Sequence, residues 1–138
     1  MVVVKRLKTL SILYIKNQVM SKTYFSEFKS DVAVAILTKD DYRYDVIKPL
    51  FDICGFGFCE TSSGCVFIDG EVKLTKDEFK WVEAHEVSHI LLKHTKDRND
   101  KDELDADTLS YKLLSENGYD KSAKLVKEHS IERHGHQI

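Results

Sequence analysis

From Thr75 onward, apolar positions recur with the 3.6-residue period of an α-helix. Thr75 and Glu78 have the spacing of a capping box, which predicts that a helix begins near Lys76 and continues to residue 93 or 94. Apolar residues surround almost the whole of this helix, so we expect it to be buried. They are Phe79, Trp81, Val82, Ala84, Val87, Ile90, Leu91 and Leu92.

Two further helices are expected after a loop of charged residues. Asp100 or Asp102 can cap the second helix, and the Asn-Gly pair at 117–118 is a common helix stop. Asp120 can cap the third helix, which would continue to about residue 132. The second half of the chain is therefore predicted to be helical.

The first half of the chain has the weaker pattern, with short runs of β-branched and aromatic residues that predict strands. Segments 10–15 and 32–38 are such runs. Segments 55–60 and 64–69 predict the two strands of a hairpin, joined by turn-forming residues at 61–64.

Residues 41–54 have apolar side chains at helical spacing, in a helix that Pro49 can interrupt because proline lacks the N–H group. The spaced positions are Tyr44, Ile47, Leu50, Phe51 and Cys54. Together the elements predict an α+β fold, in which a small mixed or antiparallel sheet of three to five strands packs on three or four helices.

The composition fits one small domain over residues 1–138, with extra strands conceivable in 1–40 and a frayed tail at 133–138. The mass is 15.9 kDa and the formal net charge is −2. The basic residues are spread along most of the chain, so no nucleic-acid partner is expected. No run approaches the roughly 20 apolar residues of a spanning helix, so we expect a soluble, cytoplasmic protein with no membrane partner.

The cysteines Cys54, Cys59 and Cys65 are odd in number and include no C-x-x-C pair. We expect free thiols that serve as small apolar side chains, rather than a disulfide framework. A thiolate that binds a metal in a latent state is the alternative, which the spacing does not support.

The strongest chemical signal is His85-Glu86-Val87-Ser88-His89, which matches the pattern H-E-x-x-H. On a helix, residues i and i+4 lie on one face, so both imidazoles can bind one metal ion. Glu86 lies beside them and can serve as a general base toward a water that the metal activates. The surrounding apolar positions favour a Zn²⁺ partner, because unpaired polar groups are costly to bury. The alternative is a pair of core histidines bonded to backbone or carboxylate groups.

The next predicted helix offers a third metal ligand. Glu103 and Asp107 are at i and i+4, and Glu103 follows His89 by 103 − 89 = 14 residues, which allows an antiparallel return. We assign Glu103 as the ligand, because peptidase zinc sites have three protein ligands and leave one position for water. Asp107 would accept the free N–H of a zinc-bound histidine, most simply that of His85. The alternative is an acidic helix start that suits the helix dipole.

The segments HEVSHILLKH and ELDADTLSYKLL together resemble the gluzincin metallopeptidases, which combine H-E-x-x-H with E-x-x-x-D on the next helix. The short spacer and small size are most similar to the ImmA/IrrE-like metallopeptidases, which are often phage-associated. Minigluzincins and HtpX-like peptidases are near neighbours. The resemblance covers residues 75–120 and implies a zincin-like helical layer that carries one zinc ion, with a sheet whose edge strand can hold an extended peptide.

These features predict a zinc-dependent endopeptidase with Glu86 as general base and a protein or peptide substrate, such as a regulator on a separate chain. Tyr111 and His94 are candidates for supporting the tetrahedral transition state. Tyr111 can instead be a core residue, and His94 a cation at a helix C-terminus. The alternative function is a zinc-containing binding or regulatory module of the same fold that cleaves nothing. The sequence leaves the oligomeric state open.

Overall fold

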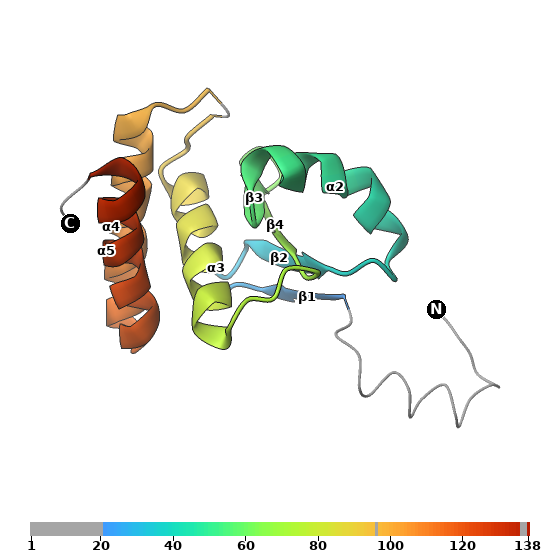
Figure 1. Cartoon of the computed structure of the whole chain (residues 1–138), viewed down its shortest axis with the longest axis horizontal. Helices are drawn as coiled ribbons and strands as arrows, with labels where there is room; N and C mark the ends of the chain where they lie inside the picture. Colours follow the sequence, from blue (N-terminus) through green and yellow to red (C-terminus); the bar gives the residue numbers. More distant parts are fainter. Residues whose placement is uncertain (1–20, 96, 136–137) are drawn as a thin grey trace.

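The computed structural model describes residues 21–95, 97–135 and 138 of the chain (Figure 1). Within these ranges the chain forms four helices and one four-stranded mixed sheet. The α+β fold class expected from the sequence is therefore confirmed.

The sheet has the strand order β1-β2-β4-β3, with antiparallel outer pairs and a parallel central pair, β2 and β4. The strands are β1 (Lys22–Phe25), β2 (Ala33–Leu37), β3 (Gly57–Glu60) and β4 (Cys65–Asp69). The strand expected within 32–38 and the hairpin are confirmed. The sequence pattern did not reveal β1, because most of its side chains are exposed and it lacks a buried alternation. The strand expected at 10–15 lies outside the described residues.

Helix α2 (Tyr42–Cys54) covers one face of the sheet, where Tyr44 and Phe51 are buried against side chains of β2 (Figure 1). The helix runs without a break through Pro49, so the interruption expected there is wrong. Pro49 lies on the exposed side, and the buried aromatic residues before and after it hold both halves of the helix to the sheet.

The outer side of α2 is apolar and exposed. Tyr42, Val46 and Ile53 expose 87%, 74% and 82% of their surfaces. Leu50 and Cys54, which the helical spacing placed with the core residues, are exposed as well. The helix thus has two apolar faces, and only one of them contacts the sheet.

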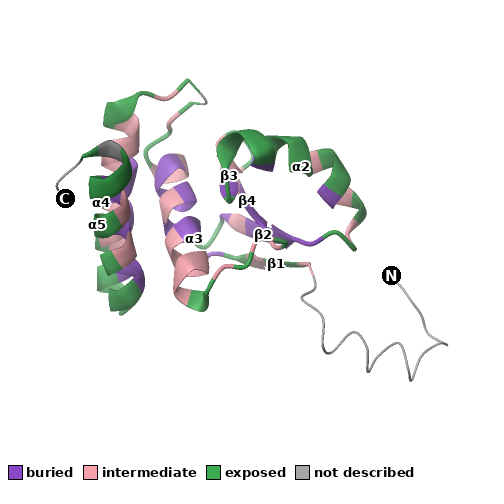
Figure 2. Ribbon diagram, in the orientation of Figure 1, coloured by how far each residue is buried: buried purple, intermediate pink, exposed green. Residues whose placement is uncertain are grey.

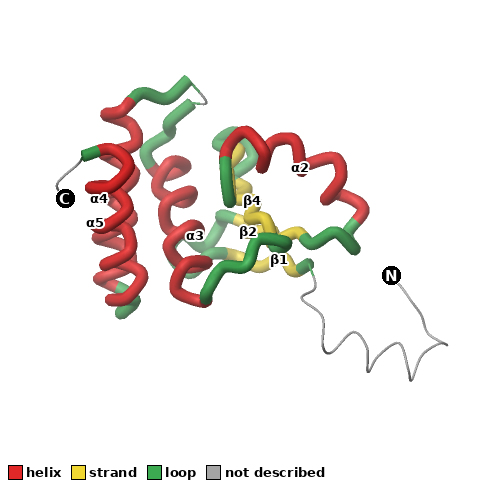
Figure 3. The backbone as a smooth tube through the Cα atoms, viewed as in Figure 1, coloured by secondary structure: helices red, strands yellow, loops and turns green. Residues whose placement is uncertain are grey.

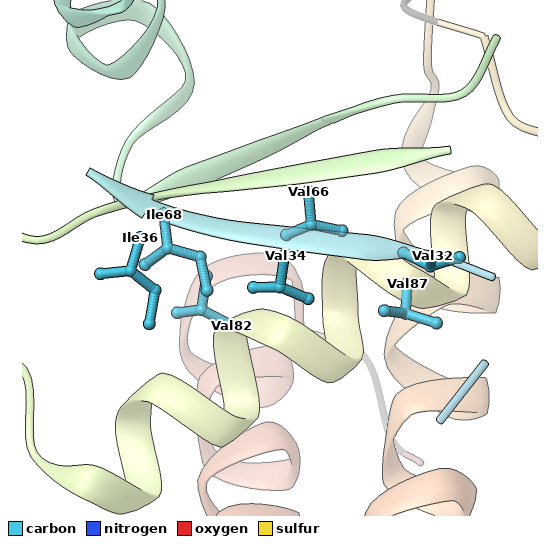
Figure 4. Close-up of a cluster of buried hydrophobic side chains, with 7 residues drawn as sticks. All are labelled: Val32, Val34, Ile36, Val66, Ile68, Val82 and Val87. Atoms are coloured by element: carbon cyan, nitrogen blue, oxygen red, sulfur yellow. The ribbon is translucent and has the colours of Figure 1, made fainter. Parts of the chain in front are cut away.

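Helix α3 (Lys76–Leu91) packs on the opposite face of the sheet, and the capping box of Thr75 and Glu78 is confirmed at its start. It ends at Leu91, earlier than the expected 93 or 94, and Leu92 is exposed rather than buried. Aliphatic side chains of β2, of the residue just before it, and of β4 and α3 form the core between helix and sheet (Figure 4). The buried members are Val32, Val34, Ile36, Val66, Ile68, Val82 and Val87.

Helices α4 (Asp100–Glu116) and α5 (Asp120–His134) form a layer on the side of α3 away from the sheet (Figure 1). The α4 cap is Asn99, not Asp100 or Asp102, and Asp102 closes the capping box instead. Helix α4 ends at the expected Asn-Gly stop, where the backbone of Gly118 has a φ of 83°. Helix α5 begins at Asp120 without a side-chain cap and extends two residues beyond the expected end at 132.

Figure 2 shows buried residues in the central strands and along α3, which has the sheet on one side and α4 and α5 on the other. The connections between the described elements are short, and the described residues 92–95 and 97–99 separate α3 from α4 (Figure 3). In the described ranges, no helix is long and apolar enough to cross a membrane.

Candidate metal centre

The two histidines of the H-E-x-x-H sequence lie one turn apart on α3 and turn toward each other. Their Nε2 atoms are 3.1 Å apart, and their rings meet edge to face with centroids 4.7 Å apart. His89 exposes 1% of its side chain and His85 exposes 18%. Two imidazole nitrogens therefore point at a single position at the border of the core.

Glu103 on the first turn of α4 completes a group of three. The Asn99–Asp102 capping box begins α4 just before it, and α4 packs beside α3. One carboxylate oxygen of Glu103 lies 3.3 Å from His85 Nε2, and the other lies 3.3 Å from His89 Nε2. His85, His89 and Glu103 thus form a group that could hold a metal ion.

The spacing of these atoms fits a small tetrahedral ion. Two ligand atoms bound to zinc at 2.0–2.1 Å with tetrahedral angles lie roughly 3.3–3.4 Å apart. The nitrogen–nitrogen separation is 3.1 Å and the two nitrogen–oxygen separations are 3.3 Å. The three side chains are therefore already close to the arrangement that such an ion would require.

Asp107 lies behind His85. Its Oδ1 atom is 3.0 Å from His85 Nδ1, and its side chain exposes only 1%. The two atoms are within hydrogen-bonding distance but are not aligned for a hydrogen bond, and neither has another hydrogen-bond partner in the described part of the chain. A small rotation of the ring would let Nδ1–H donate to the carboxylate, and a bound metal would then take the place of the proton on Nε2. This is the position that the sequence assigned to Asp107.

His94 contacts the Nδ1 side of His89 and links it to Asp102. Its Nδ1 atom is 2.9 Å from Nδ1 of His89, and its Nε2 atom is 3.5 Å from Oδ1 of Asp102. Helix α3 ends early, Lys93 takes the left-handed conformation with a φ of 58°, and the His94 N–H donates to the His89 carbonyl at 3.0 Å. The turn places His94 where it can orient His89, a role that the sequence did not suggest.

The electrostatics of the group favour a positive charge between the two acidic residues. Burial opposes protonation of His85, but the contacts with Asp107 and Glu103 outweigh it and raise the pKa of His85 to about 10. Burial would raise the pKa of Glu103 and that of Asp107, yet their histidine contacts lower both. The pKa of His89 is lowered, chiefly by burial. A field that stabilises a protonated imidazole also stabilises a metal cation.

Glu86 follows His85 on α3 and lies at the same border of the core. It exposes 8% of its surface, and its Oε1 atom is buried without a hydrogen-bond partner in the described part of the chain. A carboxylate oxygen left unpaired in this way is costly unless a bound group satisfies it. The unpaired Oε1 atom therefore indicates that a water or a ligand binds beside Glu86.

A cleft of about 440 Å³ opens over the group, and His85, Glu86, His89 and Glu103 are among its lining residues. Its walls are apolar at Phe56, Phe58, Trp81 and Val82, and they carry positive charge at Arg98 and Arg133. Tyr111 is not among the lining residues and packs against the core that α3, α4 and α5 share. His94 does not line the cleft either.

The cysteines are free thiols in the structure. Cys54 lines the cleft, and Cys59 lies between Glu86 and Arg98. Burial, reinforced by the negative charge of Glu86, raises the pKa of Cys59 to about 12. Cys59 is therefore a neutral thiol at physiological pH, unlike the thiolates that bind metals.

Comparison of the chain with protein-family models, with curated proteins and with solved structures found no match. The candidate centre is therefore supported by its own geometry. Sequence reasoning located His85, Glu86, His89, Glu103 and Asp107, which the structure brings together. It missed Arg98, His129 and Arg133 as parts of the cleft, because no local pattern shows which charged residues of a loop or a helix end turn inward.

Proposed function

We propose that this protein is a zinc-dependent endopeptidase of the gluzincin kind, with His85, His89 and Glu103 as zinc ligands and a zincin-like arrangement of helices and sheet. The observation that carries the proposal is the buried, unpaired Oε1 atom of Glu86 beside this group. A site that only stores zinc needs the three ligands but has no use for an additional buried carboxylate at this position.

When bound, a zinc ion supplies Lewis-acid chemistry by lowering the pKa of a water and polarising a carbonyl group. Glu86 accepts the proton of the attacking water and delivers it to the leaving amine. Asp107 beside Nδ1 of His85 and His94 beside Nδ1 of His89 would favour, in the metal-bound protein, the tautomer that leaves Nε2 free.

The cleft also suits an extended peptide. Strand β3 is an edge of the described sheet, and Gly57 and Phe58 of this strand line the cleft. An edge strand presents unpaired backbone N–H and C=O groups, which can pair with a substrate backbone. The apolar walls at Phe56 and Trp81 can then hold substrate side chains.

The experiment combines zinc content with cleavage of a peptide library prepared from a bacterial proteome and analysed by mass spectrometry. The wild type should bind about one zinc per chain and cleave a subset of peptides. Glu86→Gln should keep the zinc and lose cleavage by a factor of at least about 10² to 10⁴, the range attributed to general-base catalysis. Glu116→Gln, an exposed residue of α4, is the matched control and should behave as the wild type.

Cleavage by Glu86→Gln at the wild-type rate would remove Glu86 from the mechanism. Zinc binding by the wild type without any cleavage would identify the protein as a binding module. Absence of zinc from protein that has been supplied with the metal would contradict the proposal as a whole.

A further inference from the structure

Two arginines line the cleft from different elements, and neither has a carboxylate partner in the described part of the chain. Arg98 lies in the loop before α4, and Arg133 lies near the end of α5. The Nε atom of Arg98 donates to the Thr95 carbonyl at 2.9 Å, and its Nη2 atom lies 3.2 Å from Cys59 Sγ. These two contacts hold the guanidinium at the cleft and leave three of its five N–H donors for other partners.

With a metal ion bound, the positive charges that line the cleft would outnumber the negative ones. Arg98 and Arg133 face only two acidic lining residues, Glu86 and Glu103. Glu103 is paired with the two histidines, and Glu86 exposes only 8% of its surface. A divalent ion in the centre would add further positive charge, so the cleft has a positive potential that favours an anionic group in its ligand.

We infer that Arg98 and Arg133 form a carboxylate-binding subsite, and that the cleft takes peptides with an acidic side chain or a free C-terminal carboxylate near the bond that is cleaved. The inference rests on the proposed peptidase function. A planar guanidinium with free donors is the group that proteins use most often for bidentate recognition of a carboxylate. Apolar residues such as Phe56, Phe58 and Trp81 line the same cleft, and surroundings of lower polarity strengthen such a contact.

The test measures peptide binding by the zinc-loaded Glu86→Gln protein, in which the ligand stays intact. Trp81 is the single tryptophan and lines the cleft, so its fluorescence reports occupancy. One set of hexa-alanine peptides, blocked at both ends, carries glutamate at each position in turn, and a matched set carries glutamine. A third peptide is hexa-alanine with a free C-terminal carboxylate.

The subsite predicts that at least one carboxylate peptide binds on the order of tenfold more tightly than its neutral counterpart, as expected for a hydrogen bond to a charged group. A preference for internal glutamate identifies an acidic side chain as the ligand. A preference for the free terminus identifies the terminal carboxylate. Equal binding of charged and neutral peptides, or binding of none, would overturn the inference.

Arginine variants connect the preference to the subsite. Arg98→Gln combined with Arg133→Gln should abolish the discrimination, whereas Arg98→Lys should retain part of it. Lys124→Gln is the control, because it removes one positive charge from an exposed position of α5 outside the cleft. Zinc content measured for every variant shows that the centre is intact. Discrimination that persists in the double glutamine variant would mean that the carboxylate binds elsewhere, for example at the metal.

Failure of this inference can be separated from failure of the proposed function. Cleavage by the wild type without any preference for carboxylate peptides leaves the peptidase and removes the subsite. Discrimination in binding without cleavage by the wild type leaves a carboxylate-binding cleft and removes the peptidase.

Discussion

At the scale of single residues, each histidine of the centre is held by a partner on its far side. Asp107 lies against His85, and His94 lies against His89 with Asp102 beyond it. Once each ring is neutral, these contacts favour the tautomer with the proton on Nδ1, which leaves Nε2 free for a metal. They therefore fix the direction in which the metal-binding nitrogen points, and the ligands are oriented before any ion arrives.

Replacing Asp107 tests this orientation. Asp107→Ala should weaken zinc binding by about 10- to 100-fold, because His85 loses the acceptor that holds its tautomer. Asp105→Ala is the matched control, since Asp105 lies on the same helix but pairs with Lys101 at the surface. Competition with a chromophoric zinc chelator measures both affinities. Equal zinc affinity in the Asp107 variant and the wild type would show that Asp107 does not support the centre.

The residues of the centre were predictable to different degrees, for physical reasons. The pairing of His85 with His89 depends only on local structure, because any α-helix places residues i and i+4 on the same face. Predicting Glu103 as the third ligand required only that the next helix return antiparallel to the first. The position of His94 depends on the left-handed turn at Lys93, a residue type for which such a conformation is uncommon and leaves no sequence signal.

At the scale of elements, α2 presents two apolar faces with different environments. Phe51 exposes 3% of its surface in the core against the sheet, while Ile53 exposes 82% on the outer side. Helical periodicity identified the helix but not which face the sheet would cover. The sequence pattern predicted β2, whose side chains are mostly buried on both faces of the sheet. It did not predict β1, whose side chains are mostly exposed.

The two faces of α2 should respond differently to the same change. Phe51→Ala should lower the free energy of unfolding by about 3–5 kcal/mol, because it leaves a cavity beneath the helix. Ile53→Ala should change it by less than about 0.5 kcal/mol, because its side chain contacts mainly solvent. Urea unfolding followed by far-UV circular dichroism measures both. Comparable losses in the two variants would mean that the outer face is covered in solution.

At the scale of the whole molecule, the metal would join two separate helices. His85 and His89 belong to α3, whereas Glu103 belongs to α4. An ion bound to all three would stabilise the packing of these helices, and it would bind the folded chain far better than the unfolded one.

Zinc should therefore raise the thermal stability of metal-free protein. At a free concentration a hundred times the dissociation constant, the gain is about 2.7 kcal/mol, which corresponds to several degrees in Tm. His89→Ala should show little of this shift, and magnesium should have little effect on the wild type because it prefers oxygen ligands. Differential scanning calorimetry with and without each ion measures the shifts. A Tm that rises equally in His89→Ala would show that zinc binds elsewhere.

The centre is encoded in one short stretch of the chain. All three candidate ligands, Glu86, and the residues that orient the histidines lie between residues 85 and 107. Much of the cleft wall comes instead from outside this stretch, from Phe56 and Phe58 on one side and from Arg133 on the other. During evolution the walls can therefore diverge, and the choice of ligand with them, while the stretch that provides the chemistry stays unchanged.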